Sequence, residues 1–501
     1  MKTKYLDLID QTFDFPQDEF TLNNDELNFH GIDLMALIEK HGAPLKFTYL
    51  PKISDNISRA KGWFADAIKE HNYTGNYNYC YCTKSSHFKH VLDEALKNDI
   101  HIETSSAFDI DIVENLKAQG KINNNTYVIS NGFKRDQYVQ NIARLINNGH
   151  KNCITVIDNY EEITLLSDAI DGDYNIGIRI ASEEEPKFEF YTSRLGIGYK
   201  NIVPFYNKEI KDNPKVTLKM LHFFINTGIR DTAYYWNELL KCMKVYVALK
   251  KVCPSLDSLN IGGGFPIKSS LAFDFDYAYM VSEIIGQIKQ TCEEADVAVP
   301  NIFTEFGSFT VGESGGVIYE ILYQKQQNDR EKWNIINSSF ITTMPDTWAI
   351  SKRFVMLAIN GWHKEYERVL LGGLTCDSDD YYNSEQHMNG IYLPKFNKDK
   401  PLYIGFFNTG AYQETIGGFG GLQHCLIPTP KHILIDRDAK GALTTSVFAE
   451  QQTSEQLLSI LGYDYGINNA VAAADSGLSK KQVNSEITEA IKEYYQKNMI
   501  Q

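Results

Sequence analysis

The sequence predicts an α/β protein that consists of a (β/α)8 barrel followed by a mainly β domain with a helical tail. Two observations carry this prediction. From about residue 75, eight short apolar segments alternate with longer amphipathic ones, and strands that alternate with helices pair in parallel because each return needs a crossover. After residue 310 the apolar segments follow one another with few helical stretches between them. That change in the spacing of apolar segments indicates a second, mainly β domain.

The expected elements follow in chain order. A helix, a glycine-containing stop and a strand occupy IDLMALIEKHGAPLKFTYLP, and SDNISRAKGWFADAIKEH has helical spacing. The eight barrel strands are expected in YNYCYCTK, IHIETSS, TYVISNG, CITVID, IGIRIAS, LKMLHFFIN, SLNIGGG and NIFTEFG. Later strands are expected in GGVIYEILYQKQQ, RFVMLAINGW, RVLLGGLTCD, PLYIGFFNTGA and KHILIDRD. We therefore expect residues 1–45 to join the β domain, residues 46–312 to form the barrel, and residues 313–501 to form the β domain and its tail.

Composition excludes several classes of function. Hydrophobic residues make up 43% and charged residues 23% of the 501 positions, which is ordinary for a soluble globular protein. The net charge is −15 and no basic patch offsets it, so neither nucleic acid nor an anionic membrane is an expected partner. The N-terminus lacks the apolar core of a signal peptide. The eight cysteines are scattered and form no second metal-ligand pair after Cys80 and Cys82. We expect a cytoplasmic protein with reduced thiols and no metal site.

Chemistry in a barrel is found at the C-terminal ends of the strands. Lys84 closes the first of them, and a lysine partly desolvated at a barrel mouth loses proton affinity and becomes suited to Schiff-base formation; it could equally reach into solvent. The three glycines of NIGGGFP could cradle a phosphate or only allow a tight loop. These residues close the expected strands: Lys84, Glu103, Asn131, Arg179, Asn226, Thr227, Gly262, Gly263, Gly264 and Glu305.

Other candidates are equally open when taken singly. Glu305 could stabilise a protonated ring nitrogen or form a salt bridge. The acids of LTCDSDDYY lie beside Cys376 and could hold a cationic group, or they could form a polar surface turn. Tyr412, in NTGAYQE, could belong to a site, to the core or to its rim. The order of all these features along the chain is more specific than any one of them.

That order resembles the alanine-racemase-like, fold-type III, pyridoxal phosphate (PLP)-dependent decarboxylases of basic amino acids. The resemblance covers nearly the whole chain, from DLMALIEKHGAPLKFTYL to GAYQE. It is closest to the biosynthetic arginine decarboxylases, through NGFKRDQY, NNGHKNCITVIDNYEE, TCDSD and GFFNTGAYQE.

The resemblance implies a role for each candidate residue. Lys84 would bind PLP as a Schiff base, and Glu305 would keep the pyridine nitrogen protonated. The glycine turn and Tyr412 would bind the phosphate. Cys376 would donate a proton to the α-carbon. The full implied set of cofactor-binding residues is Lys84, Glu103, Arg179, Phe224, Thr227, Gly262, Gly263, Gly264, Glu305 and Tyr412.

The resemblance also implies a homodimer with shared active sites, or a higher oligomer built from it. Cys376 and Asp377 would enter the site of the neighbouring subunit, where Asp377 or Asp379 would meet the distal cation of a small basic amino acid. Two positions depart from the family pattern. Phe224 stands where a histidine usually stacks on the PLP ring, and His222 should face the same side of the strand. Ser308, in EFGS, replaces an arginine that helps to hold the phosphate.

The implied activity is decarboxylation of arginine to agmatine in polyamine and spermidine biosynthesis. Ornithine, lysine, diaminopimelate and carboxynorspermidine are alternative substrates. A catalytically inactive regulatory homologue is an alternative of another class, against which Lys84, Glu305 and Cys376 argue. A racemase leaves TCDSDD unexplained, and a phosphosugar-binding barrel without PLP leaves Lys84 and Tyr412 unexplained.

Overall fold

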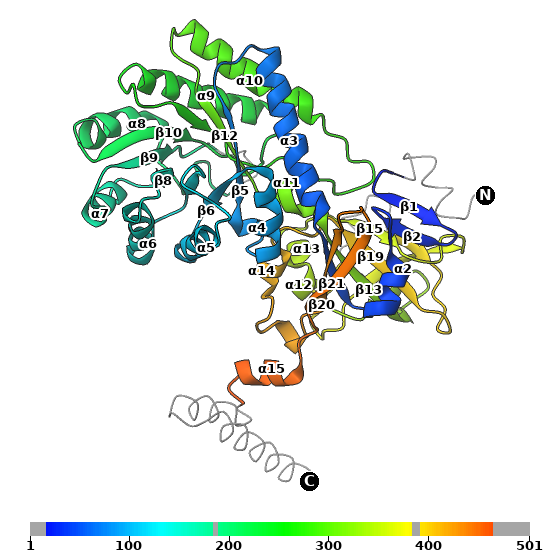
Figure 1. The fold of residues 1–501 in the computed structure, drawn as a ribbon. Helices are drawn as coiled ribbons and strands as arrows, with labels where there is room; N and C mark the ends of the chain where they lie inside the picture. The colour runs from blue at the N-terminus through cyan, green and yellow to red at the C-terminus, as the bar shows by residue number, and fades with distance from the viewer. Residues whose placement is uncertain (1–16, 184–188, 383–390, 464–501) are drawn as a thin grey trace, which may run out of the picture.

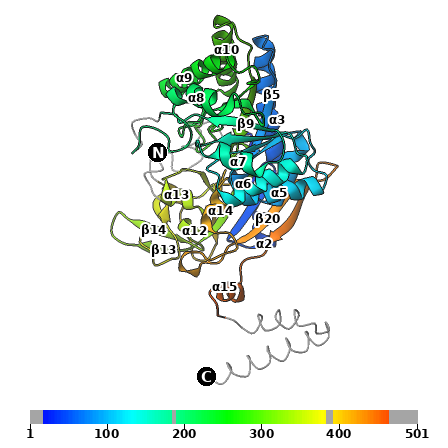
Figure 2. The ribbon, with the colours of Figure 1, turned by 90° about the vertical axis from the view of Figure 1, so that its left-hand side faces the viewer.

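The computed structural model describes residues 17–183, 189–382 and 391–463. The chain forms a helix-covered barrel and a sheet domain that lie against each other (Figure 1). Viewed from the side, helices α5 to α9 surround the barrel, while the short helices α12 to α14 lie on the sheet domain (Figure 2). Among the described residues, no helix combines the length and the apolar character needed to cross a membrane.

The barrel is closed by eight parallel strands, because the last strand pairs with the first. Each expected barrel strand is present, so the predicted fold class is confirmed. Their inward-facing side chains fill the centre, where Ile129, Val156, Met220 and Phe303 pack together. The strands are β5 (Tyr77–Cys82), β6 (His101–Thr104), β7 (Val128–Ser130), β8 (Cys153–Ile157), β9 (Tyr174–Arg179), β10 (Val216–His222), β11 (Ser258–Asn260) and β12 (Asn301–Phe306).

The helices around the barrel begin where the sequence supplies start signals. α3 has a proline at its first position, α5 begins with a capping box formed by Ser106 and Asp109, and the side chain of Thr232 caps α9. Their apolar faces pack on the outside of the strands. The helices are α3 (Pro51–Glu70), α4 (Lys89–Ala95), α5 (Ala107–Ala118), α6 (Asp136–Asn147), α7 (Glu162–Ala169), α8 (Tyr199–Phe205), α9 (Ala233–Lys250) and α10 (Tyr277–Glu294).

The second domain is built on a ten-stranded mixed sheet in which β13 pairs with β4, β14 and β19. Short helices cover it: α12 (Phe340–Thr343), α13 (Pro345–Ala349) and α14 (Gln413–Gly417). The sheet contains β4 (Leu45–Tyr49), β13 (Gly315–Gln326), β14 (Lys332–Ile336), β15 (Val355–Ala358), β16 (Tyr366–Gly372), β17 (Tyr381–Tyr382), β18 (Ile391–Pro394), β19 (Leu402–Phe407), β20 (Lys431–Arg437) and β21 (Leu443–Ala449).

The N-terminal segment packs on this sheet. It forms β1 (Phe20–Asn23), β2 (Glu26–Phe29), β3 (Ile32–Asp33) and α2 (Leu34–His41). Its side chains share one apolar core with β4, which spans the expected domain boundary, and with β19 and β20. In the tail, α15 (Ser454–Ile460) is helical; the helical prediction beyond residue 463 lies outside the described residues, as do residues 1–16.

Candidate active site

Lys84 lies in a single 3-10 turn, Thr83–Ser85, that directly follows β5. The turn is fixed by side chains: Ser85 Oγ donates to the Cys82 carbonyl at 2.8 Å, and Thr83 Oγ1 donates to the Glu103 carbonyl at 3.1 Å. Part of Lys84 is exposed, although the surrounding protein partly desolvates its amine, whereas Glu103, at the end of β6, is fully buried. The sequence therefore places an amine near a buried carboxylate at the barrel mouth.

The electrostatics of this pair correct one expectation. We expected desolvation to lower the proton affinity of Lys84. Instead, the charge of Glu103 raises the pKa of Lys84 well above its ordinary value, and this effect outweighs the opposing effect of burial. The prediction was wrong because it considered the lysine without its neighbour on the adjacent strand.

Two buried carboxylates are joined by one amide. Asn131, which follows β7, donates through Nδ2 to Glu103 Oε1 at 2.9 Å and to Glu305 Oε1 at 2.8 Å. Asn260 Nδ2 donates to the same Glu305 oxygen at 2.5 Å. Burial raises the pKa of Glu103, and the hydrogen bond from Asn131 opposes that effect. Asn260 was missed by the sequence reasoning, although it closes β11 two residues before the first glycine of the turn.

His222 lies on the other side of the Glu305 carboxylate. Its Nε2 is 3.5 Å from Glu305 Oε2, so the strand alternation correctly turns this histidine toward the site. Burial lowers the pKa of His222 well below its usual value, which leaves the ring neutral. Phe224 is half-buried, and the Arg179 guanidinium lies 5.9 Å from its ring centroid.

Several buried polar atoms at this end of the barrel lack a hydrogen-bond partner among the described residues. Unsatisfied buried polar atoms are costly and mark a place where a polar occupant is expected. They belong to residues at or after the ends of β6, β7, β9 and β10, and the ends of parallel strands meet at one mouth. The atoms are Glu103 Oε2, Asn131 Oδ1, Arg179 Nε, Thr227 Oγ1 and both ring nitrogens of His222.

The glycine turn packs tightly against its surroundings. Gly262 and Gly264 have φ values of +69° and +99°, which side-chain-bearing residues rarely adopt. A Cβ on Gly263 would lie 2.0 Å from the Glu305 carbonyl oxygen. The Glu305 N–H donates to the Gly262 carbonyl at 2.8 Å. The turn therefore lies directly beside the ring of buried polar groups.

The sheet domain contributes Tyr412 to the same mouth. The Tyr412 N–H donates to the Ser85 carbonyl at 2.8 Å, one residue beyond Lys84. Its hydroxyl contacts the side chain of Ser308, and burial raises the pKa of Tyr412 to about 12. The two domains are thus joined at the position where the resemblance implies phosphate binding.

The structure does not bring the acidic loop to this cluster: within one chain's described residues, no contact joins Cys376, Asp377 or Asp379 to Lys84. Cys376 and Asp379 are exposed. His424 Nε2 lies 3.0 Å from Asp377 Oδ2, and the Asp379 N–H donates to Asp377 Oδ1 at 2.9 Å.

The third acid of this loop has a structural role. Asp380 is buried and accepts the Phe340 N–H at 2.8 Å and the Thr375 hydroxyl at 2.7 Å. It fixes the loop to the start of α12. Asp379 is exposed, whereas Asp377 contacts His424 and accepts the Asp379 N–H.

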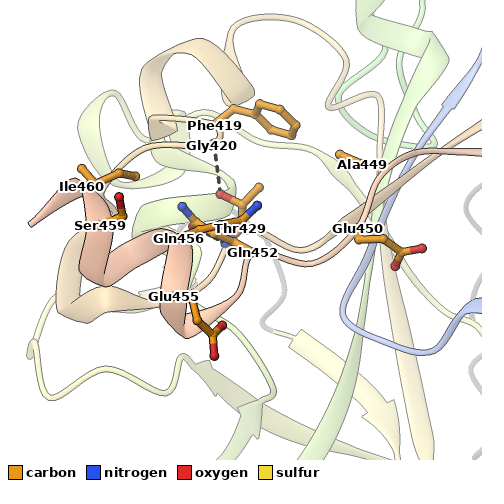
Figure 3. Close-up of a pocket in the computed structure, with 10 residues that line it drawn as sticks. All are labelled: Phe419, Gly420, Thr429, Ala449, Glu450, Gln452, Glu455, Gln456, Ser459 and Ile460. Carbon is orange, nitrogen blue, oxygen red and sulfur yellow. Dashed lines mark hydrogen bonds between the residues drawn. The ribbon is translucent and has the colours of Figure 1, made fainter. Parts of the chain in front are cut away.

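A surface pocket of about 450 Å³ lies on the sheet domain, between α15 and the segments that precede it (Figure 3). The Gly420 N–H donates to Thr429 Oγ1 across its wall. Its titratable lining side chains are Glu450 and Glu455, and none of the predicted site residues lines it. The chemistry is therefore concentrated at the barrel mouth.

Comparison with known proteins identifies the class of this fold and site. The family model described as pyridoxal-dependent decarboxylase, pyridoxal binding domain, matches residues 59–312. The chain belongs to this family: it is a PLP-dependent decarboxylase, and its cofactor is PLP.

Individual relatives are distant but similar along most of their length. Biosynthetic arginine decarboxylase 2 of Synechocystis is 22% identical, and the match covers 85% of either chain. Biosynthetic arginine decarboxylase of Geotalea uraniireducens is 23% identical over 78% of this chain and 81% of its own. Among solved structures, the biosynthetic arginine decarboxylase of Campylobacter jejuni superposes with a TM-score of 0.75, 19% identity and 94% coverage of both chains. Diaminopimelate decarboxylase of M. jannaschii, in complex with L-lysine, superposes with a TM-score of 0.74 and 18% identity. The match covers 88% of this chain and 97% of that one.

Proposed function

We propose that this enzyme decarboxylates arginine to agmatine, a step of polyamine and spermidine biosynthesis. The observation that carries the chemistry is the Lys84 amine at the same barrel mouth as the Glu305 carboxylate, which accepts hydrogen bonds from two buried amides. The names of the curated relatives support arginine as the substrate, and so do the neighbouring carboxylates of Asp377 and Asp379.

The residues at the barrel mouth fit PLP. Lys84 would hold its aldehyde carbon, and Glu305 its ring nitrogen. The unpartnered groups of Arg179, Thr227, Glu103 and His222 would supply polar contacts, with Phe224 against the ring. The turn of Gly262, Gly263 and Gly264 would hold the phosphate together with Tyr412 and Ser308. When bound, PLP supplies an electron sink for the charge left by the departing carboxylate.

The protein's own groups then control protons and charge. Glu305, which accepts hydrogen bonds from Asn131 and Asn260, would hold a proton on the ring nitrogen. Neutral His222 adds no charge that would compete for that carboxylate. Cys376 Sγ donates a proton to the α-carbon, and Asp377 or Asp379 binds the guanidinium at the far end, where a carboxylate matches its planar fork of donors.

We infer that the working unit is a homodimer. Cys376 is exposed and separate from Lys84 within one chain, so a site that uses both requires a second copy. The eight free cysteines support a cytoplasmic location, where thiols stay reduced.

The substrate is tested by measuring amine products and kcat/KM with arginine, ornithine, lysine, diaminopimelate and carboxynorspermidine. We expect arginine to lead. Asp379→Asn should lower kcat/KM for arginine roughly tenfold to a hundredfold, because a hydrogen bond to a charged group contributes about 1.5–3 kcal/mol. Asp399→Asn, at another exposed acid, is the matched control. A different leading substrate would refute the choice of arginine, and no product from any of the five would favour the inactive homologue.

Sharing of the site is tested by mixing Lys84→Ala and Cys376→Ala enzymes, each inactive alone. Free exchange of subunits gives half heterodimers with one intact site each, so activity should return to about a quarter of wild type. Exchange is verified by native mass spectrometry. Proven exchange without recovery would place both residues in one chain's site.

A further inference from the structure

The cysteines divide into two groups. Six of the eight are buried, and only Cys376 and Cys425 are exposed. Cys376 lies in the loop after β16, and Cys425 lies in the 3-10 turn His424–Leu426. Although they are 49 positions apart, the two exposed thiols belong to segments that meet in space.

The neighbours of the two cysteines hold these segments together. His424 Nε2 is 3.0 Å from Asp377 Oδ2, so the residue before one cysteine pairs with the residue after the other. The thiol of Cys425 contacts that of Cys376. Cys425 and Leu426 both have φ values of +52°, an uncommon backbone conformation for residues with side chains. The turn is also closed by backbone hydrogen bonds from Leu426 to Gln423 and from Ile427 to His424.

We propose that Cys376 and Cys425 form a reversible disulfide when hydroperoxide oxidants are present, and that this bond switches the decarboxylase off. The switching part rests on the proposed role of Cys376 as proton donor. Two thiols already in contact need only small side-chain rotations to reach disulfide geometry, which is otherwise demanding. The contact between His424 and Asp377 keeps the effective concentration of the two thiols high.

The chemistry balances with hydrogen peroxide as oxidant. The Cys376 thiolate attacks one peroxide oxygen, the O–O bond breaks, and a sulfenic acid and one water result after proton transfer. The Cys425 sulfur then attacks the Cys376 sulfur, the S–O bond breaks, and a second water leaves. Two thiols are oxidised to a disulfide and one peroxide is reduced to two waters. A small dithiol reverses the reaction by exchange. In the oxidised form Cys376 carries no proton to donate.

The test treats the wild-type holoenzyme and the Cys425→Ser variant with hydrogen peroxide and then with dithiothreitol. Native wild type should show two reagent-accessible thiols, the variant one, and oxidised wild type none, because the other six are buried. Peptide mass mapping should link the segments that contain residues 376 and 425, with loss of two hydrogens. Activity should fall in proportion to the linked fraction and return with dithiothreitol, while the visible absorbance of lysine-bound PLP persists. His424→Gln should form the link more slowly.

The result that overturns the proposal is equal, irreversible inactivation of wild type and Cys425→Ser with no linked peptide. Fewer than two accessible thiols in the native dimer would also overturn it, because the pair would then be covered. The linked peptide is measured without turnover. If the link forms in an enzyme that never releases agmatine, the proposed function fails and the disulfide stands.

Discussion

Replacing Asn131 with alanine isolates the group that links the two buried carboxylates. Its amide nitrogen donates one hydrogen to Glu103 and one to Glu305, at 2.9 and 2.8 Å. Asn131 and both carboxylates are largely shielded from water, with exposed fractions of 3%, 0% and 6%. The substitution therefore removes two charge-assisted hydrogen bonds and leaves the like charges on Glu103 and Glu305 without a donor between them.

The magnitude follows from these contacts. A hydrogen bond to a charged group contributes about 1.5–3 kcal/mol, so the loss of two sets an upper range of about 3–6 kcal/mol. Asn260 still donates to Glu305, which places the expected loss of unfolding free energy near the lower end, about 3 kcal/mol. Burial raises the pKa of Glu103 and the hydrogen bond from Asn131 opposes that effect, so the substitution should raise this pKa further. Activity that needs ionised Glu103 should then be lost at a higher pH as the pH falls.

The assay combines urea unfolding of the apoenzyme with kcat against pH. Asn141→Ala is the control for the pH profile, because Asn141 is also buried but lies outside the carboxylate pair: its Nδ2 donates to the Ala107 carbonyl at 2.9 Å, and its Oδ1 accepts from the Arg144 guanidinium at 3.0 Å. The control should lose stability and keep its pH profile. An Asn131→Ala enzyme that loses less than about 1 kcal/mol and keeps an unshifted acid limb would refute this account of the carboxylate pair.

Three further predictions concern the same charges and the buried histidines. Glu305→Gln should retain the visible absorbance of lysine-bound PLP but lose about a hundredfold or more in kcat, since a neutral amide cannot hold the ring proton; unchanged kcat would remove Glu305 from this role. Glu103→Gln should lower the pKa of Lys84, so the acid limb of PLP association, followed by absorbance, should move to lower pH; a limb at the wild-type pH would contradict the pairing. Burial lowers the pKa of His432 from 6.5 to about 3, so below pH 6.5 the unfolded chain binds a proton that the folded chain excludes, and the histidine costs about 1.4 kcal/mol of stability per pH unit. His432→Gln should therefore lose less unfolding free energy than wild type between pH 7 and 5, and equal losses would show that this histidine does not contribute.

The barrel was predictable because its strands are buried on both faces. Such strands read as short continuous apolar runs, as in β8, where all five residues are buried. Their ends could then be located in the sequence, and with them Lys84, Glu103 and Glu305. The strands of the sheet domain were harder to predict from the sequence. Most of β21 is exposed and shows no apolar alternation, and β17 has only two residues, so neither carries a recognisable strand pattern.

Site geometry could be predicted only in part, because it depends on pairs that are distant in sequence. Asn131 and Glu305 are 174 positions apart, and nothing local shows that they share a hydrogen bond. The proton affinity of Lys84 was misjudged for the same reason, since its chief determinant lies on the neighbouring strand. In the acidic loop, the sequence offers three similar aspartates. Only the fold shows that the Asp380 carboxylate accepts hydrogen bonds from backbone N–H groups of α12.

The fold also shows what surrounds Ser308, one of the two departures from the family pattern. Ser308 stands at the position where the family pattern has an arginine. In the structure its side chain contacts the Tyr412 hydroxyl. Tyr412 is itself fixed by its backbone bond to Ser85, so a neutral pair of hydroxyls from two domains lies at that position. Hydroxyls can donate to a phosphate but add no positive charge. In the proposed PLP site, more of the compensation for phosphate charge would therefore come from the backbone N–H groups of the glycine turn, whose Gly263 has no room for a side chain.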